Sequence, residues 1–207
     1  MGCSSAIVAN ICQGTQLTFL TDTLSNDDTD TDTVRTALLA KCVPAPATTV
    51  VANDSATTVN ATSGEPVTGN VFVVLGGPYR QTLVQYLENH GVTSVYYAFD
   101  ASHGGFNGRS ADGGADPVLV KVLYTALDGA HSSFVIETVR DPASGTLLLA
   151  LYGLDAAGTD AATFYFVNHV LPNIGTFTSG YYVYDWVDGD GNKTPGDADT
   201  FTLVTSG

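Results

Sequence analysis

The stretch Asn70-Val71-Phe72-Val73-Val74-Leu75-Gly76-Gly77-Pro78 decides the fold class. A short continuous apolar run that ends in a tight turn is typical of a strand buried on both faces of a sheet. Apolar residues then recur at helical spacing over 83–87, and Asn89-His90-Gly91 supplies a helix stop. Because Val95–Phe99 follows as a second β-prone run, we expect a strand–helix–strand unit with a parallel crossover.

Toward the C-terminus the pattern alternates between strands and one helix. The run Thr146–Tyr152 predicts a third core strand, and Gly158-Thr159 predicts the start of a helix over Ala161–Val170. The glycine-rich segment Asp100–Pro117 is expected to be a surface loop. Further β-prone residues fill Ser133–Val139, Gly175–Val187 and Thr200–Thr205. The sequence therefore predicts an α/β fold with a parallel-type strand–helix–strand core and β-rich N- and C-terminal segments.

Three regions follow from shifts in composition along the chain. Residues 1–42 hold all three cysteines, a β-prone run and an acidic loop that precedes a short helix at Val34–Ala40. Residues 1–20 of this segment are either an assembly strand donated to a neighbouring subunit or part of the chain's own domain. Residues 43–69 are rich in Pro, Thr and Ala, which indicates a linker or an extended edge segment. Residues 70–207 form the α/β domain, with an Asp-rich loop near its C-terminal end.

The charge balance restricts the partners of the protein. Acidic residues outnumber basic residues by 21 to 7, which gives a formal net charge of -14. Nucleic acids and anionic membrane surfaces repel such a chain, and no apolar stretch of about 18 residues predicts a membrane span. Because like charges destabilise a compact state, we expect bound cations or a high-salt medium. Charged residues make up only 14% of the chain, and such an uncharged polar surface indicates an extracellular or cell-surface location.

The cysteines and the sequons also suit an exported protein. Pairing of Cys12 with Cys42 would close a loop across the Asp/Thr-rich stretch, which leaves Cys3 unassigned. Three separate buried thiols are the alternative. Asn53 and Asn60 each begin an Asn-X-Ser/Thr sequon in a stretch that we expect to be exposed, so both are candidate glycosylation sites.

The most specific local signal is the spacing of oxygen-bearing residues in the segment 188–199. Acids at its first, third and twelfth positions, with Asn and Thr between them, match a calcium loop; the candidate Ca²⁺ ligands are Asp188, Asp190, Asn192, Thr194 and Asp199. Lys193 replaces the usual turn glycine and Asp199 is shorter than the usual Glu, so we expect an affinity suited to millimolar extracellular calcium. Asp185 is a candidate further ligand. A solvated Asp/Gly turn is the alternative.

Other motifs give weaker indications of a binding or catalytic site. The acidic run Asp22, Asp27, Asp28, Asp30 and Asp32 is interpreted as a solvated loop, with metal binding as the alternative. The turn at Gly76-Gly77-Pro78 resembles a phosphate-binding turn, but no Walker lysine follows and Pro78 removes one N–H donor. The four histidines show no metal-ligand spacing, and no serine lies in a G-x-S-x-G motif. We therefore predict no catalytic residues and no enzymatic activity.

Several short motifs occur in a fixed order over residues 70–172: Asn70–Pro78, then Phe134-Val135-Ile136-Glu137 with Arg140-Asp141-Pro142, then Leu147–Ala150 leading to Tyr152-Gly153 and Gly158-Thr159-Asp160-Ala161-Ala162. In combination they resemble the archaeal S-layer protein domain. The resemblance implies an extracellular lattice or appendage role and brings no catalytic residues with it. The cysteine-bearing N-terminal segment and the calcium-like loop depart from a full-length lattice protein and fit a smaller subunit, such as that of a filament.

These observations predict an extracellular structural protein, a subunit of a cell-surface layer or filament that assembles with copies of itself and is stabilised by calcium. One alternative is an exported hydrolase on a doubly wound sheet, with a crevice near Gly77 and Gly153. Its site residues would be Asp100, His103, Arg109 and Asp155. Another alternative is a carbohydrate-binding or adhesin module, which would stack sugars on Tyr181, Tyr182, Tyr184 and Trp186.

Overall fold

The structure is a computed structural model, and it describes residues 11–12, 16–21, 25–52, 59–60, 62–67 and 71–207. Several subjects of the sequence prediction lie outside these residues. They include Cys3, Asp22, the sequon at Asn53 and most of the segment 1–20 that was considered as an assembly strand.

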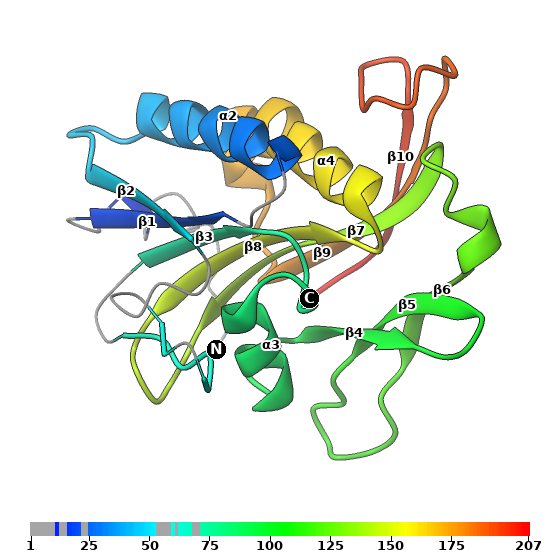
Figure 1. Cartoon of the computed structure of the whole chain (residues 1–207), viewed down its shortest axis with the longest axis horizontal. Helices are drawn as coiled ribbons and strands as arrows, with labels where there is room; N and C mark the ends of the chain where they lie inside the picture. Colours follow the sequence, from blue (N-terminus) through cyan, green and yellow to red (C-terminus); the bar gives the residue numbers. More distant parts are fainter. Residues whose placement is uncertain (1–10, 13–15, 22–24, 53–58, 61, 68–70) are drawn as a thin grey trace.

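The fold is a mixed α/β arrangement built on two sheets (Figure 1). The large sheet has seven strands in the order β10-β9-β7-β8-β3-β1-β2, and the small sheet has three in the order β4-β5-β6. The large sheet contains β1 (Gln16–Thr21), β2 (Ala47–Ala52), β3 (Val71–Leu75), β7 (His131–Arg140), β8 (Leu147–Gly153), β9 (Tyr181–Val187) and β10 (Thr200–Ser206). The small sheet contains β4 (Val95–Phe99), β5 (His103–Gly108) and β6 (Val118–Leu123), followed by the 3₁₀ turn η1 (Tyr124–Ala126).

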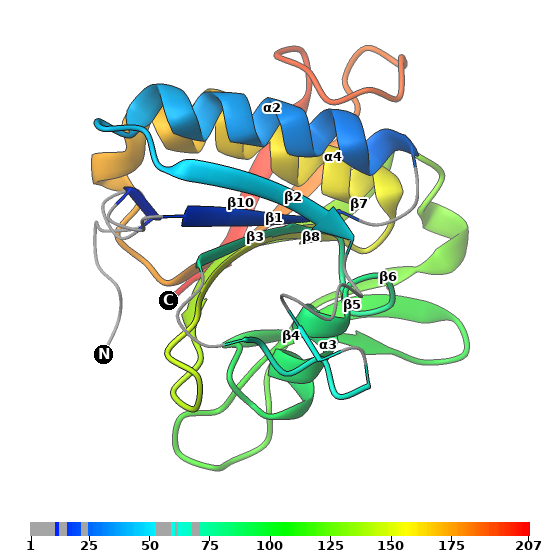
Figure 2. The ribbon, with the colours of Figure 1, turned by 60° about the vertical axis from the view of Figure 1, so that its left-hand side comes forward.

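Helices and the small sheet cover opposite faces of the large sheet (Figure 2). Helices α2 (Ser25–Lys41) and α4 (Ala156–Tyr165) lie on one face, and α4 continues into the turns η2 (Phe166–Val170) and η3 (Leu171–Thr176). Helix α3 (Thr82–Asn89) and the small sheet lie on the other face. Two hydrophobic clusters, one on each face, therefore form the core.

The position of β3 in the sheet explains why Val71–Leu75 is continuously apolar. Strand β3 pairs in parallel with β1 on one side and with β8 on the other. All seven residues of β8 are buried, and four of the five residues of β3 are buried. Alternate side chains point to opposite faces, so Val73 packs below α2 and α4 while Phe72 packs toward α3. The predicted doubly buried strand is confirmed.

The partner predicted for this strand is wrong. Val95–Phe99 is β4, which pairs antiparallel with β5 in the small sheet rather than in parallel with β3. Strand β5 lies inside the segment Asp100–Pro117, which we expected to be a loop. The prediction missed this strand because glycine, which is depleted in strands, makes up half of its residues. The structure requires small residues there, since a Cβ atom on Gly105 would lie 2.2 Å from the carbonyl oxygen of Val120.

A parallel strand–helix–strand unit occurs instead at the N-terminal end of the described chain. Strand β1 leads into α2 and then into β2, which pairs with β1 in parallel. The helix begins at Ser25 rather than at the predicted Val34, so Asp27, Asp28, Asp30 and Asp32 of the acidic run lie in its first turns and not in a loop. Asp22 lies outside the described residues. Acidic side chains in the first turns are favoured by the positive end of the helix dipole. Strand β2 lies at the edge of the large sheet.

Most of the remaining predicted elements are confirmed. Strands β7, β8, β9 and β10 fall within or close to the predicted β-prone runs. Helix α4 starts at Ala156, earlier than predicted, because the Asp155 side chain accepts a hydrogen bond from Gly158 N and caps the helix.

The predicted disulfide is confirmed as a bond between Cys12 and Cys42. It joins a residue before β1 to the residue just after α2, and the two cysteines are 30 positions apart in the sequence. Closing a loop of this length in the unfolded chain stabilises the fold by roughly 3–4 kcal/mol on the chain-entropy account.

We predict that replacing both Cys12 and Cys42 by Ser lowers the free energy of unfolding by about 3 kcal/mol. Chemical unfolding followed by circular dichroism measures the loss, and a reducing agent should lower the stability of the wild type by a similar amount. Cys3→Ser is the control because it leaves the bonded pair intact. Equal stability of the double variant and the wild type would show that the bond does not hold β1 and α2 together.

Candidate functional site

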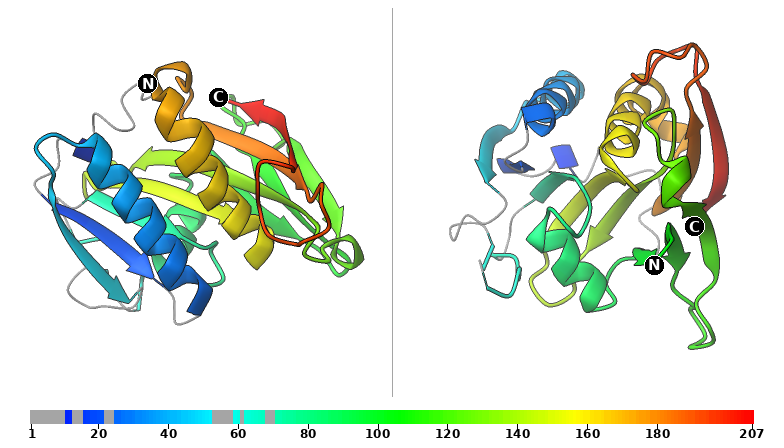
Figure 3. Two further views of the ribbon diagram at one scale, coloured as in Figure 1. Left: turned by 90° about the horizontal axis from the view of Figure 1, so that it is seen from above. Right: turned by 45° about the vertical axis from the view of Figure 1, so that its right-hand side comes forward.

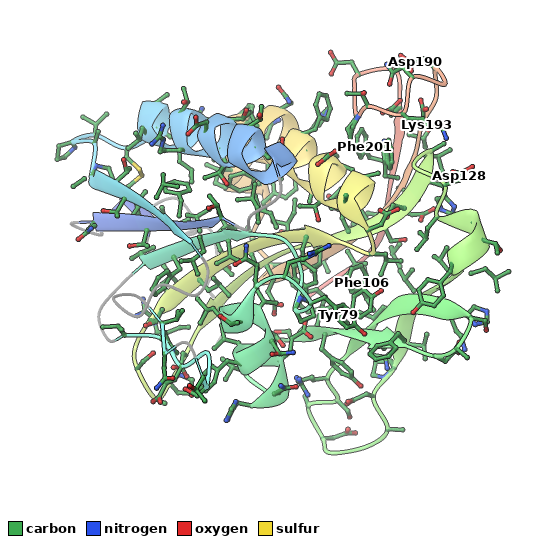
Figure 4. All side chains as sticks on the ribbon, in the orientation of Figure 1. Tyr79, Phe106, Asp128, Asp190, Lys193 and Phe201 are labelled. Carbon is green, nitrogen blue, oxygen red and sulfur yellow. A yellow bond between two sulfur atoms is a disulfide. The ribbon has the colours of Figure 1, made fainter. Side chains whose placement is uncertain are left out.

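The predicted calcium loop connects the antiparallel strands β9 and β10 (Figure 4). It spans residues 188–199 and projects beyond the end of the large sheet, with Asp190 near its tip. The acidic segment is therefore one loop that is held at both ends by the paired strands β9 and β10.

The Asp188 carboxylate organises the first half of the loop through backbone N–H groups. Its Oδ1 accepts hydrogen bonds from Asp190 N at 3.1 Å and Gly191 N at 2.8 Å. Its Oδ2 accepts one from Lys193 N at 2.8 Å. These hydrogen bonds lower the pKa of Asp188, with the bond from Lys193 N as the largest cause. The first ligand position therefore carries a charged carboxylate held in one orientation.

The Asp199 carboxylate closes the loop from its other end. Its Oδ1 accepts a hydrogen bond from Gly189 N at 2.9 Å, and its Oδ2 accepts one from Gly196 N at 2.9 Å. The same Oδ2 accepts the indole N–H of Trp186 at 2.9 Å. Trp186 is fully buried, so the twelfth position of the loop is connected directly to the core. Sequence reasoning gave no role to this contact, because the spacing alone does not show which side chain faces Asp199.

Three predicted ligands come together. One carboxylate oxygen each from Asp188, Asp190 and Asp199 lie within 4.8 Å of one another. Oxygens bound to the same Ca²⁺ at about 2.3–2.6 Å lie at most about 5.2 Å apart, so this spacing fits one calcium ion. A divalent cation would neutralise the repulsion among the three carboxylates.

The two neutral candidates lie on the same loop. Asn192 Oδ1 accepts a hydrogen bond from Thr194 N at 2.6 Å, and its Nδ2 donates one to Asp190 Oδ2 at 2.9 Å. Lys193 adopts a left-handed φ of 60°, the conformation that favours glycine at this position of a calcium loop. Its Nζ donates to Asp128 O at 2.8 Å and so points away from the acidic cluster, as Figure 4 shows.

Asp185, the candidate further ligand, takes part in a different contact. Its Oδ1 accepts a hydrogen bond from Ser133 Oγ at 2.9 Å and lies 3.0 Å from His131 Nε2. It does not belong to the acidic group formed by Asp188, Asp190 and Asp199.

A separate crevice lies at the carboxyl ends of β3 and β8, where the hydrolase alternative placed a site. The chain leaves β3 toward α3 on one face and leaves β8 toward α4 on the other, which makes this a topological switch point. The crevice has a volume of about 230 Å³ and is lined by residues 76–80, Tyr97, residues 153–156 and Thr159.

The four residues proposed for that hydrolase are not brought together. Asp155 lines the crevice, but Asp100 and His103 line a different groove on the small sheet. Arg109 donates from its Nη2 to Glu88 O and from its Nε to Thr93 O at 2.9 Å.

Ser102, His103 and Asp100 contain the residue types of a catalytic triad without its geometry. His103 Nδ1 lies 2.9 Å from Ser102 Oγ and 3.0 Å from Asp100 Oδ1. A triad uses one ring nitrogen for the serine and the other for the carboxylate, whereas here one nitrogen faces both. The three residues form a local turn, in which Lys121 also pairs with Asp100 at 2.8 Å.

The aromatic side chains proposed for sugar stacking are largely inside the protein. Tyr182, Tyr184 and Trp186 are buried, and Tyr181 is half-buried. They belong to β9, and Tyr182, Tyr184 and Trp186 are part of the hydrophobic cluster that packs beneath α2 and α4. The exposed stacking surface predicted for these residues is therefore wrong for these three.

Two carboxyl groups are buried between the large sheet and α3. Glu137 Oε1 accepts a hydrogen bond from Ser94 N at 2.5 Å, and Glu88 Oε1 accepts the Tyr152 hydroxyl at 2.8 Å. Burial raises the pKa of Glu137 to about 8 and that of Glu88 to about 7. Hydrogen bonds to Glu88 from Tyr152 and from Tyr97 N oppose this rise, as does the nearby charge of Arg109.

Asn60, the first residue of its sequon, is exposed. The Asn60 Oδ1 accepts hydrogen bonds from Thr62 N at 2.9 Å and from Ser63 N at 3.1 Å.

Comparison with known proteins leaves the family open. No protein-family model matches the chain, and no curated protein matches it. Among the described residues, no helix has both the length and the apolar character that a membrane span requires.

The buried carboxyls give stability a defined pH dependence. In the unfolded chain both groups lose their protons near pH 4.5, but in the folded protein they do so only near pH 7 and pH 8. Between these values the folded state binds more protons, so the free energy of unfolding falls as pH rises.

We predict that Glu137→Gln reduces this slope, because Gln stays neutral and its Oε1 can still accept from Ser94 N. At pH 8.5 the variant should melt roughly 10 °C above the wild type, whereas near pH 4.5 the two should melt together. Calorimetry across this pH range measures the difference. Glu65→Gln, at an exposed position, should keep the wild-type slope. Superimposable pH profiles for Glu137→Gln and the wild type would contradict the assignment.

Proposed function

We propose that this protein is an extracellular structural subunit that binds Ca²⁺ through the β9–β10 loop and associates with copies of itself through its sheet edges. The observation that carries the proposal is the group of Asp188, Asp190 and Asp199 oxygens within 4.8 Å, on a loop whose backbone already holds two of these carboxylates in place. Preorganised ligands reduce the entropy that is lost when an ion binds.

Charge supports calcium as the ion. The chain has a net charge of -14, so each bound Ca²⁺ relieves repulsion throughout the molecule. Oxygen-only ligands favour a hard cation, and the short Asp at the twelfth position favours an affinity in the range of extracellular calcium. The Cys12–Cys42 bond is compatible with the same oxidising environment.

The two edges of the large sheet support self-association. Strand β10 forms one edge and β2 the other, and neither strand contains a charged residue. Leu203 and Val204 on β10 are 49% and 41% exposed, and Val50 on β2 is 41% exposed. Edge strands without charges or Pro readily pair with another chain.

The strand directions fit a continuous sheet across subunits. Strand β2 runs parallel to β8, whereas β10 runs opposite to both, so β10 of one copy and β2 of the next would pair antiparallel. Such head-to-tail pairing extends without closure and produces a filament or one row of a layer. An S-layer or filament subunit, as the sequence resemblance suggested, would use this arrangement.

The calcium prediction has a built-in reporter, because the single tryptophan of the chain donates to Asp199. In chelator-treated protein we expect Ca²⁺ to change the Trp186 fluorescence with a Kd of about 1 mM. About 10 mM Ca²⁺ should then raise Tm by roughly 4 °C. Asp188→Asn should abolish the saturable fluorescence change.

Asp197→Asn is the matched control, since Asp197 is an exposed acid of the same loop outside the acidic group. A fluorescence titration that is flat in the wild type, or equally weakened by both variants, would refute the calcium site.

Self-association is tested by sedimentation velocity in calcium over a range of protein concentrations. We expect the wild type to form oligomers that grow with concentration, and Leu203→Lys to remain a monomer because a charge on the edge opposes pairing. Val118→Lys places the same charge on an exposed apolar residue of the small sheet and should associate like the wild type. A monomeric wild type, or oligomers of Leu203→Lys, would overturn edge pairing.

A further inference from the structure

Helices α2 and α4 lie side by side on the same face of the large sheet (Figure 3). Beside them is a cavity of about 210 Å³. Asp30 and Thr33 of α2 line it together with Asp160 and Thr163 of α4, and Thr194 and Pro195 of the β9–β10 loop form another wall. Three elements that are distant in sequence therefore meet around one cavity, whose wall also includes Phe164 and Val167.

Two carboxyl groups face each other across the helix pair. The side chains of Asp30 and Asp160 are hydrogen-bonded to each other. Two carboxyl groups can be this close only if they share a proton or if a cation lies between them. No Lys or Arg is among the described residues that line the cavity.

The Thr163 hydroxyl supplies an independent observation. Thr163 is only 2% exposed, and its Oγ1 has no hydrogen-bond partner among the described residues. A helical Thr commonly satisfies its hydroxyl on a carbonyl three or four residues earlier. A buried hydroxyl without a partner costs about 1–3 kcal/mol, so its place on the cavity wall beside two carboxyls indicates that it serves a ligand.

We infer that this cavity is a second divalent-cation site, in which the carboxylates of Asp30 and Asp160 and the hydroxyl of Thr163 bind Ca²⁺. All three donors are oxygens, which suits a hard cation, and water can complete the coordination in a cavity of this size. The ion fastens α2 to α4, and thus the disulfide-bonded N-terminal unit to the rest of the domain. The site shares no ligand with the acidic group of the β9–β10 loop, so the inference stands apart from the function proposed above.

Isothermal titration calorimetry with CaCl₂ on chelator-treated protein tests the site. We expect the wild type to bind two Ca²⁺ ions, Asp160→Asn to bind one and Asp188→Asn to bind one. The Trp186 fluorescence change should survive in Asp160→Asn and disappear in Asp188→Asn. Asp32→Asn, an acid of α2 that pairs with Arg35 on the surface, should still bind two ions.

Thr163→Val is a second variant, which keeps the shape of the side chain and removes only the hydroxyl. It should weaken binding at the helix site by about tenfold while leaving the loop site unchanged. The inference is overturned if the wild type and Asp160→Asn bind the same number of ions, since the two carboxyls would then merely share a proton. A wild type that binds one ion, lost in Asp160→Asn and kept in Asp188→Asn, would support the helix site while refuting the loop site.

Discussion

The protein contains seven basic and 21 acidic residues, so most carboxylates cannot pair with a Lys or Arg side chain. This shortage of positive charge determines which groups bind the carboxylates. Backbone N–H groups take the place of Lys and Arg at many of them. Asp188 and Asp199 each accept two or more such bonds, and Asp141 accepts bonds from Ala143 N and Ser144 N in the turn between β7 and β8. N–H groups fix a carboxylate and lower its pKa, but they do not reduce the net charge. Where several carboxylates lie close together, a bound cation can both fix their orientation and reduce the net charge.

The two faces of the large sheet handle acidic groups in opposite ways. On the face covered by α2 and α4, the carboxylates cluster near solvent, where cations have access. On the other face, Glu88 and Glu137 are sealed against Tyr152 and Ser94, and burial favours their neutral form. The doubly buried strands β3 and β8 separate the two environments. The same core thus keeps acidic groups near solvent on one side and neutral polar contacts on the other.

The sequence predicted those elements whose structure depends on neighbouring residues in the chain. The spacing within 188–199 identified the loop, and the apolar run at 71–75 identified the central strand, because both patterns reflect short-range geometry. The partner of each element was harder to predict. Val95–Phe99 pairs with a glycine-rich strand whose pattern is weak, and Asp30 meets Asp160 only because α2 and α4 cross the same face of the sheet. Such contacts depend on topology, which hydrophobic periodicity does not encode.

The calcium loop and the exposed edge strand are physically one unit. Asp199 ends the loop and Thr200 begins β10, while the same Asp199 binds the indole of Trp186 in the neighbouring strand β9. An ion that fixes Asp199 therefore fixes the first residues of β10 against β9. Phe201, the next residue, stacks on Phe164 of α4, so the order extends from the loop to the helix layer. An edge strand pairs with another chain through its unpaired backbone groups, and an ion at Asp199 would restrain the Thr200 end of β10, which precedes the register shift between Leu203 and Thr205. If the proposed ion binding and edge pairing both occur, the ion acts on assembly through the conformation of this end of the edge as well as through charge.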